Sequence, residues 1–388
     1  MKLFIITSRI PYPLDKGDKL RIYHQMKSLA KVNELYLCAI QLPFSKKTKE
    51  ARTELETFCK EVHFIKLSFV QIIASLVSAV FSKLPFQTAL FTSKKGKNKV
   101  NQLLKEIKPA YIYCQLSRAA EYVRESNIPK TLDYMDVFSK GFERRTLRAT
   151  FYTKWLYNWE TRKQRDYETD LFKDFNKHTI ISEEDRSFIN HPDNLSIKII
   201  KNGVDFGHFI PQKIKLKYDI VFVGNMGYAP NIDAAKYLCK EVLPILQKKI
   251  PSIQILLAGT QPTKTVIKLQ SDSVTVSGWM EDIRTAYASS KICIAPMRIG
   301  TGLQNKLLEA MAMNRACVCT RLAAKPIQAP EGSLSVGNTK EELAALCLEL
   351  LQNEEKRNQV ASAGNQYVKN TYQWSKTTEQ LNKLFYSN

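Results

Sequence analysis

The residues best suited to chemistry in this 388-residue chain lie in one stretch, residues 295–313. An apolar run at residues 292–295 predicts a buried parallel strand, and the glycine-rich turn after it is expected to open a helix near Gly302. At about 100° per residue, the polar positions of this helix fall within one arc, formed by Gly302, Asn305, Lys306 and Glu309. Because the rest of the helix is apolar, it should be largely buried, and its polar arc should face a cleft.

This arrangement predicts a binding site for a phosphate or diphosphate. The first-turn N–H groups and the helix dipole favour an anion, and Arg298 and Lys306 would add positive charge beside it. Glu309 lies too deep in the helix to cap it, so its carboxylate would accept hydrogen bonds from sugar or ribose hydroxyls. The alternative is an ordinary strand and helix of a doubly wound domain, in which Lys306 and Glu309 form only an intrahelical pair.

The same stretch resembles the donor-site motif of the retaining glycosyltransferases of family 4, in which a Glu precedes Glu-Ala-Met-Ala by seven residues. The second Glu corresponds to Glu309, and Thr301 occupies the position of the first. A bacterial subgroup of exopolysaccharide-associated sugar transferases is more similar, because it carries Gly-Ile-Gln-Asn-Lys-Val-Leu-Glu-Ala-Met-Ala-Met here. The resemblance implies catalytic roles for Lys306 and Glu309 within a donor site that also includes Thr301, Gly302, Gln304 and Asn305.

A loop rich in Pro and Gly follows the first predicted strand, at residues 8–21. Gly17 would let a ligand approach the backbone, with Arg9 and Arg21 as cationic neighbours. A loop with solvated charges is the alternative. The loop resembles the opening Pro-x-Pro-x-x-Lys-Gly-Asp-Lys-x-Arg of the same subgroup, in which it faces the interdomain cleft. We therefore assign Gly17 and Arg21 to the donor and Arg9 to the acceptor.

Polar side chains also follow two later strands of the predicted N-terminal sheet. Arg118 comes just after one strand, and Asp133 and Asp136 come at the end of the next. These positions lie at the carboxyl edge of a parallel sheet, where ligands bind. We expect Arg118 to contact the acceptor and Asp133 or Asp136 to act as the base that takes its proton. Helix N-caps and a local ion pair are the alternative.

The second half of the chain restarts the strand and helix alternation at residue 218. Gly224 ends a strand and would let the ligand approach the backbone, with Asn225 beside it. The broad family places an Arg directly after this Gly and a Lys soon afterwards, so neutralising the diphosphate would fall to Arg298, Lys306 and the helix N-terminus. Residues 278–280 resemble the family's turn against the nucleotide base, which adds Gly278, Trp279 and Met280 to the predicted donor site.

Alternating strands and helices predict an α/β chain with doubly wound parallel sheets. The Asn-Gly-Val-Asp at residues 202–205 resembles the end of the first domain in family 4 enzymes. We therefore expect a GT-B fold of two Rossmann-like domains that face each other across a cleft. The predicted parts are an acceptor-side domain (1–204), a linker (205–217), a donor domain (218–370) and a C-terminal helix that returns to the first domain (371–388).

The net charge of +21 predicts an anionic partner. The first hundred residues contain 18 Lys and Arg against 7 Asp and Glu, but no nucleic-acid motif accompanies them. We expect the charge to attract a nucleotide-sugar and, at the periphery, an anionic membrane. The longest apolar stretch, residues 69–81, is too short to span a bilayer. This stretch could form a core helix, a wall of the acceptor site, or an interfacial helix flanked by Lys66 and Lys83. We favour the first two over the interfacial helix.

Eight cysteines in mostly apolar runs are expected to be reduced core residues. The N-terminal apolar run is too short for a signal peptide and is expected to form the first strand. These features favour a cytoplasmic protein, with possible peripheral attachment to the inner face of the membrane.

The predicted function is a hexosyltransferase that moves sugar from a nucleotide-diphosphate sugar to a glycan or lipid-linked acceptor in surface polysaccharide or glycoconjugate synthesis. Its resemblance to family 4 implies retention of configuration without a metal or other cofactor, and no nucleic acid is expected as a partner. A nucleotide-sugar epimerase with the same fold is one alternative. The other is an inactive sugar-nucleotide-binding protein. This alternative is considered because Thr301 and Asn225 differ from the residues that the family has at these positions.

Overall fold

A computed structural model describes residues 1–43, 45, 48–146, 149–300 and 302–386. The chain forms two compact units. The N-terminal unit contains Met1–Asn202 and the segment from Trp374 onward, and the C-terminal unit contains Gly203–Gln373. The segment expected to be a linker therefore belongs to the C-terminal unit.

The N-terminal unit is built on a seven-stranded parallel sheet with strand order β3-β2-β1-β4-β5-β6-β7. Its central strands are continuous apolar runs, as expected for a parallel sheet covered on both faces. In β1, for example, Leu3 to Ile6 are fully buried. The strands are β1 (Lys2–Thr7), β2 (Glu34–Gln41), β3 (Glu61–Lys66), β4 (Tyr111–Gln115), β5 (Lys130–Met135), β6 (Lys177–Ile180) and β7 (Lys198–Ile199).

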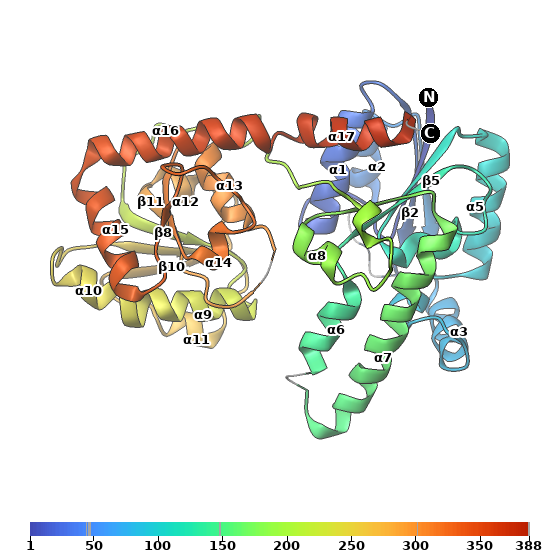
Figure 1. Ribbon diagram of the computed structural model, residues 1–388, viewed down its shortest axis with the longest axis horizontal. Coiled ribbons are helices and arrows are strands. Elements are labelled where there is room, and N and C mark those ends of the chain that lie inside the picture. The colour runs from blue at the N-terminus through green and yellow to red at the C-terminus, as the bar shows by residue number, and fades with distance from the viewer. Residues whose placement is uncertain (44, 46–47, 147–148, 301, 387–388) are drawn as a thin grey trace. The chain divides into compact units, whose positions relative to one another are not determined.

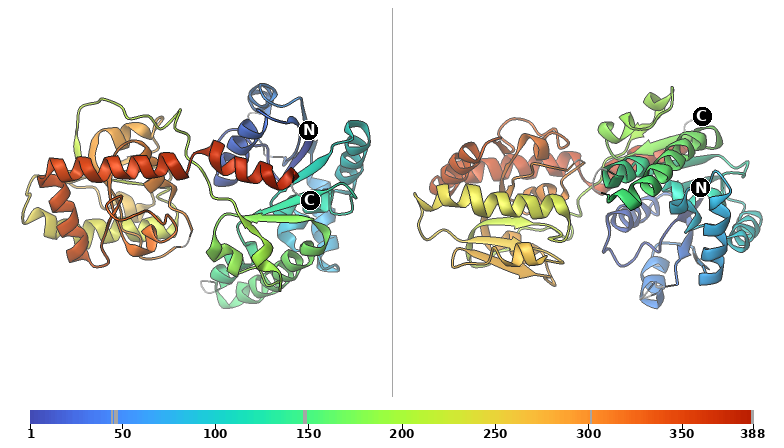
Figure 2. Two further views of the ribbon diagram at one scale, coloured as in Figure 1. Left: turned by 45° about the horizontal axis from the view of Figure 1, so that its top comes forward. Right: turned by 90° about the horizontal axis from the view of Figure 1, so that it is seen from below.

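Helices cover both faces of this sheet (Figures 1 and 2). The C-terminal helix α17 packs on α1, where the Trp374 indole stacks on the His24 ring with centroids 5.1 Å apart. The helices are α1 (Gly17–Leu29), α2 (Thr48–Glu56), α3 (Phe69–Val80), α4 (Phe86–Ala89), α5 (Lys94–Ile107), η1 (Ser117–Tyr122), α6 (Phe138–Thr146), α7 (Phe151–Asp170), η2 (Leu171–Asp174), α8 (Glu183–Ser187), η3 (Asn194–Ser196) and α17 (Trp374–Tyr386).

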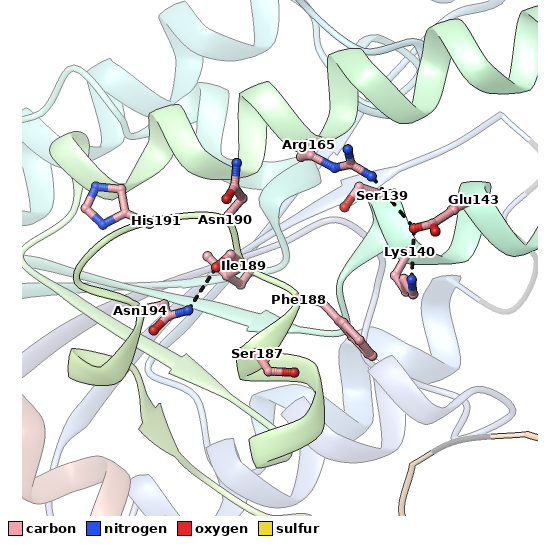
Figure 3. A pocket seen from close by; sticks show the side chains of 10 residues that line it. All are labelled: Ser139, Lys140, Glu143, Arg165, Ser187, Phe188, Ile189, Asn190, His191 and Asn194. Carbon is pink, nitrogen blue, oxygen red and sulfur yellow. Dashed lines mark hydrogen bonds and ion pairs between the residues drawn. The ribbon is translucent and has the colours of Figure 1, made fainter.

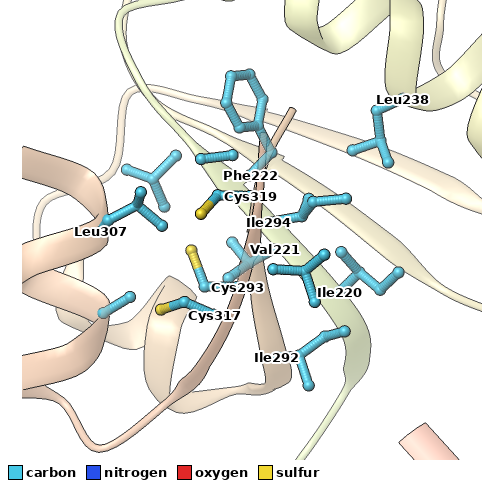
Figure 4. Close-up of a cluster of buried hydrophobic side chains, with 14 of the residues drawn as sticks. Ile220, Val221, Phe222, Leu238, Ile292, Cys293, Ile294, Leu307, Cys317 and Cys319 are labelled. Atoms are coloured by element: carbon cyan, nitrogen blue, oxygen red, sulfur yellow. The ribbon is translucent and has the colours of Figure 1, made fainter. Parts of the chain in front are cut away.

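The C-terminal unit repeats this plan with a six-stranded parallel sheet of order β10-β9-β8-β11-β12-β13. Its core contains Phe222 on β8, Leu307 and three of the cysteines (Figure 4). All eight cysteines are free thiols, and every one except the half-buried Cys239 is buried, which confirms the predicted core role. The strands are β8 (Tyr218–Val223), β9 (Ile255–Ala258), β10 (Val274–Gly278), β11 (Ser290–Ala295), β12 (Ala316–Cys319) and β13 (Ser335–Val336).

In Figure 1, α9 lies on one side of this second sheet and α13 and α16 lie on the other. Helix α15 begins with a capping box, in which Thr339 and Glu342 satisfy each other's backbone N–H groups. The helices are α9 (Ala229–Tyr237), η4 (Leu238–Val242), α10 (Leu243–Gln247), α11 (Lys264–Ile267), α12 (Arg284–Ala288), α13 (Asn305–Ala312), α14 (Arg321–Ala324), α15 (Lys340–Gln352) and α16 (Glu354–Thr371).

The strand order determines where ligands can bind in each unit. The order reverses direction between β1 and β4 in the first sheet and between β8 and β11 in the second. Ligands of open α/β sheets bind beyond the carboxyl ends of the strands at such reversal points. The structure confirms the predicted α/β fold of two doubly wound parallel sheets. Among the described helices, none is long and apolar enough to cross a membrane.

Candidate functional site

Three of the four residues of the predicted polar arc, Asn305, Lys306 and Glu309, lie on a helix of the C-terminal unit, which begins three residues later than expected. Helix α13 starts at Asn305, not near Gly302. Gly300 and Gly302 have φ angles of 109° and 88°. These positive values are incompatible with a right-handed helix, so both residues belong to the loop between β11 and α13. Thr301 lies outside the described residues. The polar residues Lys306 and Glu309 are thus on the first two turns of α13.

The Lys306 ammonium is partly buried and has no carboxylate partner. Its Nζ donates to Asn231 Oδ1 at 2.7 Å and lies 4.6 Å from the centroid of the Phe222 ring. No carboxylate oxygen of a described residue is within 4.0 Å of it. Burial lowers the pKa of Lys306 to about 8, because it disfavours the charged form. This cation therefore remains available for an anion that approaches the start of α13.

Glu309 lies one turn after Lys306 and is held by a residue that the sequence analysis missed. The Tyr287 hydroxyl, on α12, donates to Glu309 Oε2 at 2.8 Å. The other oxygen, Oε1, has no hydrogen-bond partner among the described residues. Burial raises the pKa of Glu309 to about 7, although the bond from Tyr287 and the charge of Lys306 oppose this shift. Oε1 can therefore accept a hydrogen bond from a ligand hydroxyl.

Gly224 has a different role from the one predicted. A side chain at this position would meet the amide of Asn231, with 2.8 Å between the added Cβ and Nδ2, so a protein side chain, not a ligand, occupies that space. Asn231 Nδ2 in turn donates to the Asn225 carbonyl at 2.9 Å. The predicted residues Gly224 and Asn225 are thus linked through Asn231 to Lys306, and Asn231 orients the ammonium.

Arg298 is not free to neutralise a diphosphate as predicted. Its guanidinium pairs with Asp233 at 2.8 Å and with Glu241 at 3.2 Å, and it lies over the Tyr237 ring. These carboxylates come from α9 and η4, and the hydrogen bonds to Asp233 raise the pKa of Arg298.

The remaining predicted donor residues lie at two places in the same unit. Gln304 precedes α13, and its Nε2 donates to the Gly302 carbonyl at 3.2 Å. The Asn305 Oδ1 is buried without a partner. At the end of β10, Gly278 has a φ of 67°, and the Trp279 side chain that follows is 70% exposed. Met280 packs partly against the core.

Arg21 and Asp133 form a buried ion pair in the N-terminal unit. Both side chains are fully buried, and Arg21 Nε lies 2.8 Å from Asp133 Oδ2. Asp133 also accepts bonds from the hydroxyls of Tyr113 and Thr179 and from the Met135 backbone. Burial alone would lower the pKa of Arg21, but Asp133 beside it outweighs burial and leaves the pKa raised.

This ion pair corrects two predicted roles. Arg21 also donates to Asn202 Oδ1 at 2.9 Å, so its guanidinium is committed to protein partners and does not contact a donor. Asp133 has no exposed surface from which to take an acceptor proton. The pair joins α1 to β5 and to the end of the unit's main segment. It differs from both alternatives given above, because it is fully buried and its partners lie 112 positions apart in the sequence.

The other predicted acceptor residues form a charged cluster at the carboxyl edge of the first sheet. Asp18 pairs with Arg9 at 2.8 Å and with Arg118 at 3.7 Å. Arg118 lies between the rings of Phe91 and Phe138, 4.9 and 4.6 Å from their centroids, and its Nε has no partner. Burial and the charge of Arg9 lower the pKa of Arg118 to about 10. The cluster can take up an additional anion.

Asp136 lies near this cluster and keeps a free carboxylate. The residue is exposed, and its carboxylate has no hydrogen bond or ion pair among the described residues. Partial desolvation raises the pKa of Asp136 to about 6, and the charge of Asp185 adds to the rise. Gly17 is the exposed first residue of α1. Asp136, not Asp133, therefore has the exposure and pKa of a base.

Two cavities adjoin this edge of the N-terminal sheet. The first, of about 440 Å³, lies beside the loop after β1 and includes Arg9, Lys16 and Lys19 in its lining. The second, of about 360 Å³, lies between α6, α7 and residues 187–194 (Figure 3). Glu143 in this second cavity pairs with Lys140 and Arg165. Within the described part of the chain, no group of three or more His, Cys, Asp or Glu side chains is placed to hold a metal ion.

Comparisons with known proteins agree with this architecture. Residues 217–353 match the family model described as "Glycosyl transferases group 1". An "uncharacterized 44.6 kDa protein in cps region" of Klebsiella pneumoniae is 23% identical over 346 residues, which are 84% of each chain.

Two solved structures share the fold over the whole length. TarM superposes with a TM-score of 0.70 at 11% identity, covering 100% of this chain and 99% of that one. Anabaena HepE in complex with UDP and glucose superposes with a TM-score of 0.67 at 13% identity, covering 100% of both chains. Residues 217–353 are thus similar to the glycosyl transferases group 1 model, and the chain as a whole has the GT-B fold.

Proposed function

We propose that this protein is a glycosyltransferase that moves a sugar from a nucleotide-diphosphate sugar to a glycan or lipid-linked acceptor. One observation supports this proposal most directly. The Lys306 ammonium is partly buried at the first turn of α13 without a carboxylate partner among the described residues, and the Glu309 carboxylate lies one turn further on. A cation beside free backbone N–H groups favours a diphosphate, and a carboxylate in the next turn favours hydroxyl groups.

In the proposed reaction, α13 and Lys306 stabilise the departing nucleotide diphosphate. Negative charge grows on the phosphate oxygens as the bond to the sugar breaks, so an ammonium and a helix N-terminus that already point there lower the barrier. Glu309 Oε1 accepts a hydrogen bond from the sugar or ribose and orients the donor. We propose that Lys306 and the N-terminus of α13 take the place of a metal ion. We also propose that the transferred sugar is a hexose and keeps its anomeric configuration.

We propose that the N-terminal unit binds the acceptor through Arg9 and Arg118. The cavity beside the β1 loop is lined by Arg9, Lys16 and Lys19 against one carboxylate, Asp15, which pairs with Lys19. This excess of positive charge suits an acceptor that carries a phosphate or carboxylate better than a neutral sugar. Asp136 would then take the proton from the attacking hydroxyl, since it is exposed and its pKa is raised to about 6. A lipid-linked acceptor with a phosphate group meets these requirements.

The proposed biological role is the synthesis of a surface polysaccharide or glycoconjugate. It is supported by the Klebsiella relative from a cps region. The HepE complex with UDP and glucose makes UDP-sugars the first donors to test.

Donor binding can be tested by thermal stabilisation with UDP-, GDP-, dTDP- and ADP-sugars. We expect one nucleotide class to raise the melting temperature of the wild type and of a Lys248→Ala control, which removes an exposed lysine of the same unit. Lys306→Ala and Glu309→Ala should lose the shift. Stabilisation that both site variants retain would contradict the proposed site, and no shift with any donor would contradict the proposed function.

Transfer must then be separated from the two alternatives. A glycosyltransferase releases free nucleotide diphosphate at a rate that depends on added acceptor. An epimerase instead converts the donor sugar without needing an acceptor, and an inactive binding protein retains the donor unchanged. Chromatography of the nucleotide products, with and without acceptor, distinguishes these three outcomes.

A further inference from the structure

Helix α3 exposes an apolar face that the sequence analysis expected to be buried. Its twelve residues contain no charged side chain, and they are held by a capping box between Ser68 and Gln71. Ile72 and Leu76 pack against the core of the N-terminal unit. The opposite face, however, is open, with 51–87% of each side chain exposed at Phe69, Val70, Ile73, Val77, Val80 and Phe81. The interpretation of residues 69–81 as a core helix therefore holds for the face that carries Ile72 and Leu76 and is wrong for the exposed face.

Helix α7 is fixed directly to the end of α3. Lys163 Nζ donates to the carbonyls of Ala79 and Ser82, both at 2.6 Å, and so satisfies C-terminal groups of α3. The same ammonium lies 3.9 Å from the centroid of the Trp159 ring, which packs on Phe86 just beyond α3. These contacts place one stripe of α7 beside α3, as Figure 1 also shows for the two helices.

That stripe continues toward the start of α7 with more exposed apolar side chains. Trp155 precedes Trp159 by four residues, so it lies on the same face about 6 Å further along the helix. It is 67% exposed, and it has Phe151, Tyr152 and Leu156 as exposed neighbours. We define the apolar face of the N-terminal unit as two sets of exposed side chains. The first set is on and just after α3, and the second is on the first turns of α7: Phe69, Val70, Ile73, Val77, Val80, Phe81, Phe151, Tyr152, Trp155 and Leu156.

Exposed lysines adjoin the two helices of this apolar face. Residues 62–105 contain seven lysines and no Asp or Glu. Lys66 and Lys83 flank α3 and are exposed, and Lys154 is exposed among the aromatic residues of α7. Apolar and aromatic side chains with a rim of lysines match the boundary between the acyl chains and head groups of an anionic membrane.

We propose that the apolar face binds the surface of an anionic lipid bilayer, with α3 and the start of α7 inserted among the head groups. A second copy of the chain is a poorer occupant, because two such faces would bring their lysines together. This attachment is inferred from the exposed side chains of the N-terminal unit and does not depend on the proposed reaction. It would present the N-terminal unit to an acceptor embedded in the membrane.

The experiment is co-sedimentation of the full chain with lipid vesicles in the absence of nucleotide-sugar. We expect binding to mixed phosphatidylglycerol and phosphatidylcholine vesicles, weaker binding to pure phosphatidylcholine, and loss of binding in high salt. Ile73→Glu with Val77→Glu should lower the partition coefficient about tenfold or more, because it puts charge into the inserted face. Trp155→Glu should weaken binding as well, which tests the contribution of α7.

A matched control is Ser362→Glu with Ala363→Glu, which adds the same charge at exposed positions of α16 and should leave binding within about twofold of the wild type. Circular dichroism and thermal stabilisation by the donor verify that each variant is folded with an intact donor site. Equal sedimentation of wild type and the α3 variant would overturn the proposal, as would equal binding to neutral and anionic vesicles. A wild-type dimer in light scattering that Ile73→Glu with Val77→Glu dissociates, without vesicle binding, would assign the face to a second copy.

Discussion

The partly buried Lys306 makes donor affinity depend on pH in a defined direction. Burial lowers the pKa of Lys306 to about 8 in the free protein. A bound diphosphate favours the ammonium over the neutral amine, so the pKa of Lys306 must rise when the donor binds. Donor binding above pH 8 therefore takes up a proton, and affinity must fall as the pH rises through this pKa.

The size of the effect follows from the fraction of Lys306 that is charged before binding. That fraction falls about tenfold, from about nine tenths at pH 7 to about one tenth at pH 9. If the bound lysine stays protonated, the affinity falls by the same factor, which is about 1.4 kcal/mol of binding free energy. The diphosphate of a nucleotide-diphosphate sugar keeps its charge over this range because each phosphate is substituted on both sides.

Isothermal titration calorimetry with the donor at several pH values between 7 and 9 measures the effect. Glu309, with a pKa raised to about 7, also titrates at the lower end of this range. The matched variant is therefore Lys306→Arg, which keeps the contribution of Glu309 and carries a charge that does not titrate below pH 12. The wild type should lose about tenfold more affinity than the variant over this range. Equal slopes for the two proteins would refute a role for the Lys306 ammonium in binding the diphosphate.

Three further predictions concern stability and catalysis. Asp133→Asn should lower the free energy of unfolding by about 3–5 kcal/mol in denaturant titrations, because it leaves Arg21 buried without a counter-charge. Asp136→Asn should not lower the midpoint, because the raised pKa of Asp136 means that its charge does not stabilise the fold at neutral pH. A midpoint for Asp133→Asn equal to that of the wild type would contradict the structural role of Asp133. Gly259→Ala should cost far more stability than Gly332→Ala, since both have positive φ but only the Gly259 Cβ would meet a carbonyl oxygen, at 1.8 Å. The kcat/KM for the acceptor should fall about tenfold per pH unit below about pH 6, because protonated Asp136 cannot accept the proton of the attacking hydroxyl. If Asp136→Asn keeps the wild-type kcat/KM, Asp136 is not the base.

The polar arc of α13 could be predicted because helical periodicity fixes the angle between residues wherever the helix starts. Lys306 and Glu309 share a face although the helix begins at Asn305, because their separation of three residues is unchanged. The two doubly wound parallel sheets could also be predicted, since alternating apolar strands and helices have few ways to pack. What the sequence could not supply was the partner of each side chain. Tyr287 and Asn231 hold the two key residues from 22 and 75 positions away.

Helix α3 shows a second limit of sequence analysis. A run of apolar residues indicates that a helix avoids water, but it does not identify what covers each face. Ile72 and Ile73 are adjacent and nearly identical in chemistry, yet one is 7% exposed and the other 61%. Only the packing of α3 against the core separates them. An apolar helix without charged residues is thus compatible with either a protein or a membrane partner, and its lysine flanks favour the latter.

Pairing with carboxylates separates the three cations that were predicted to face the donor. Arg21, Arg298 and Lys306 were all predicted to face the donor, and each is positively charged. Arg21 and Arg298 have their carboxylates in the protein, so a phosphate would have to displace Asp133 or Asp233 and Glu241 to reach them. Among the described residues, Lys306 contacts an amide oxygen, a thioether sulfur and a ring, none of which neutralises it. A partly buried ammonium in such surroundings is costly in free energy, and either loss of its proton or a bound anion relieves that cost; the proposed donor diphosphate supplies the anion.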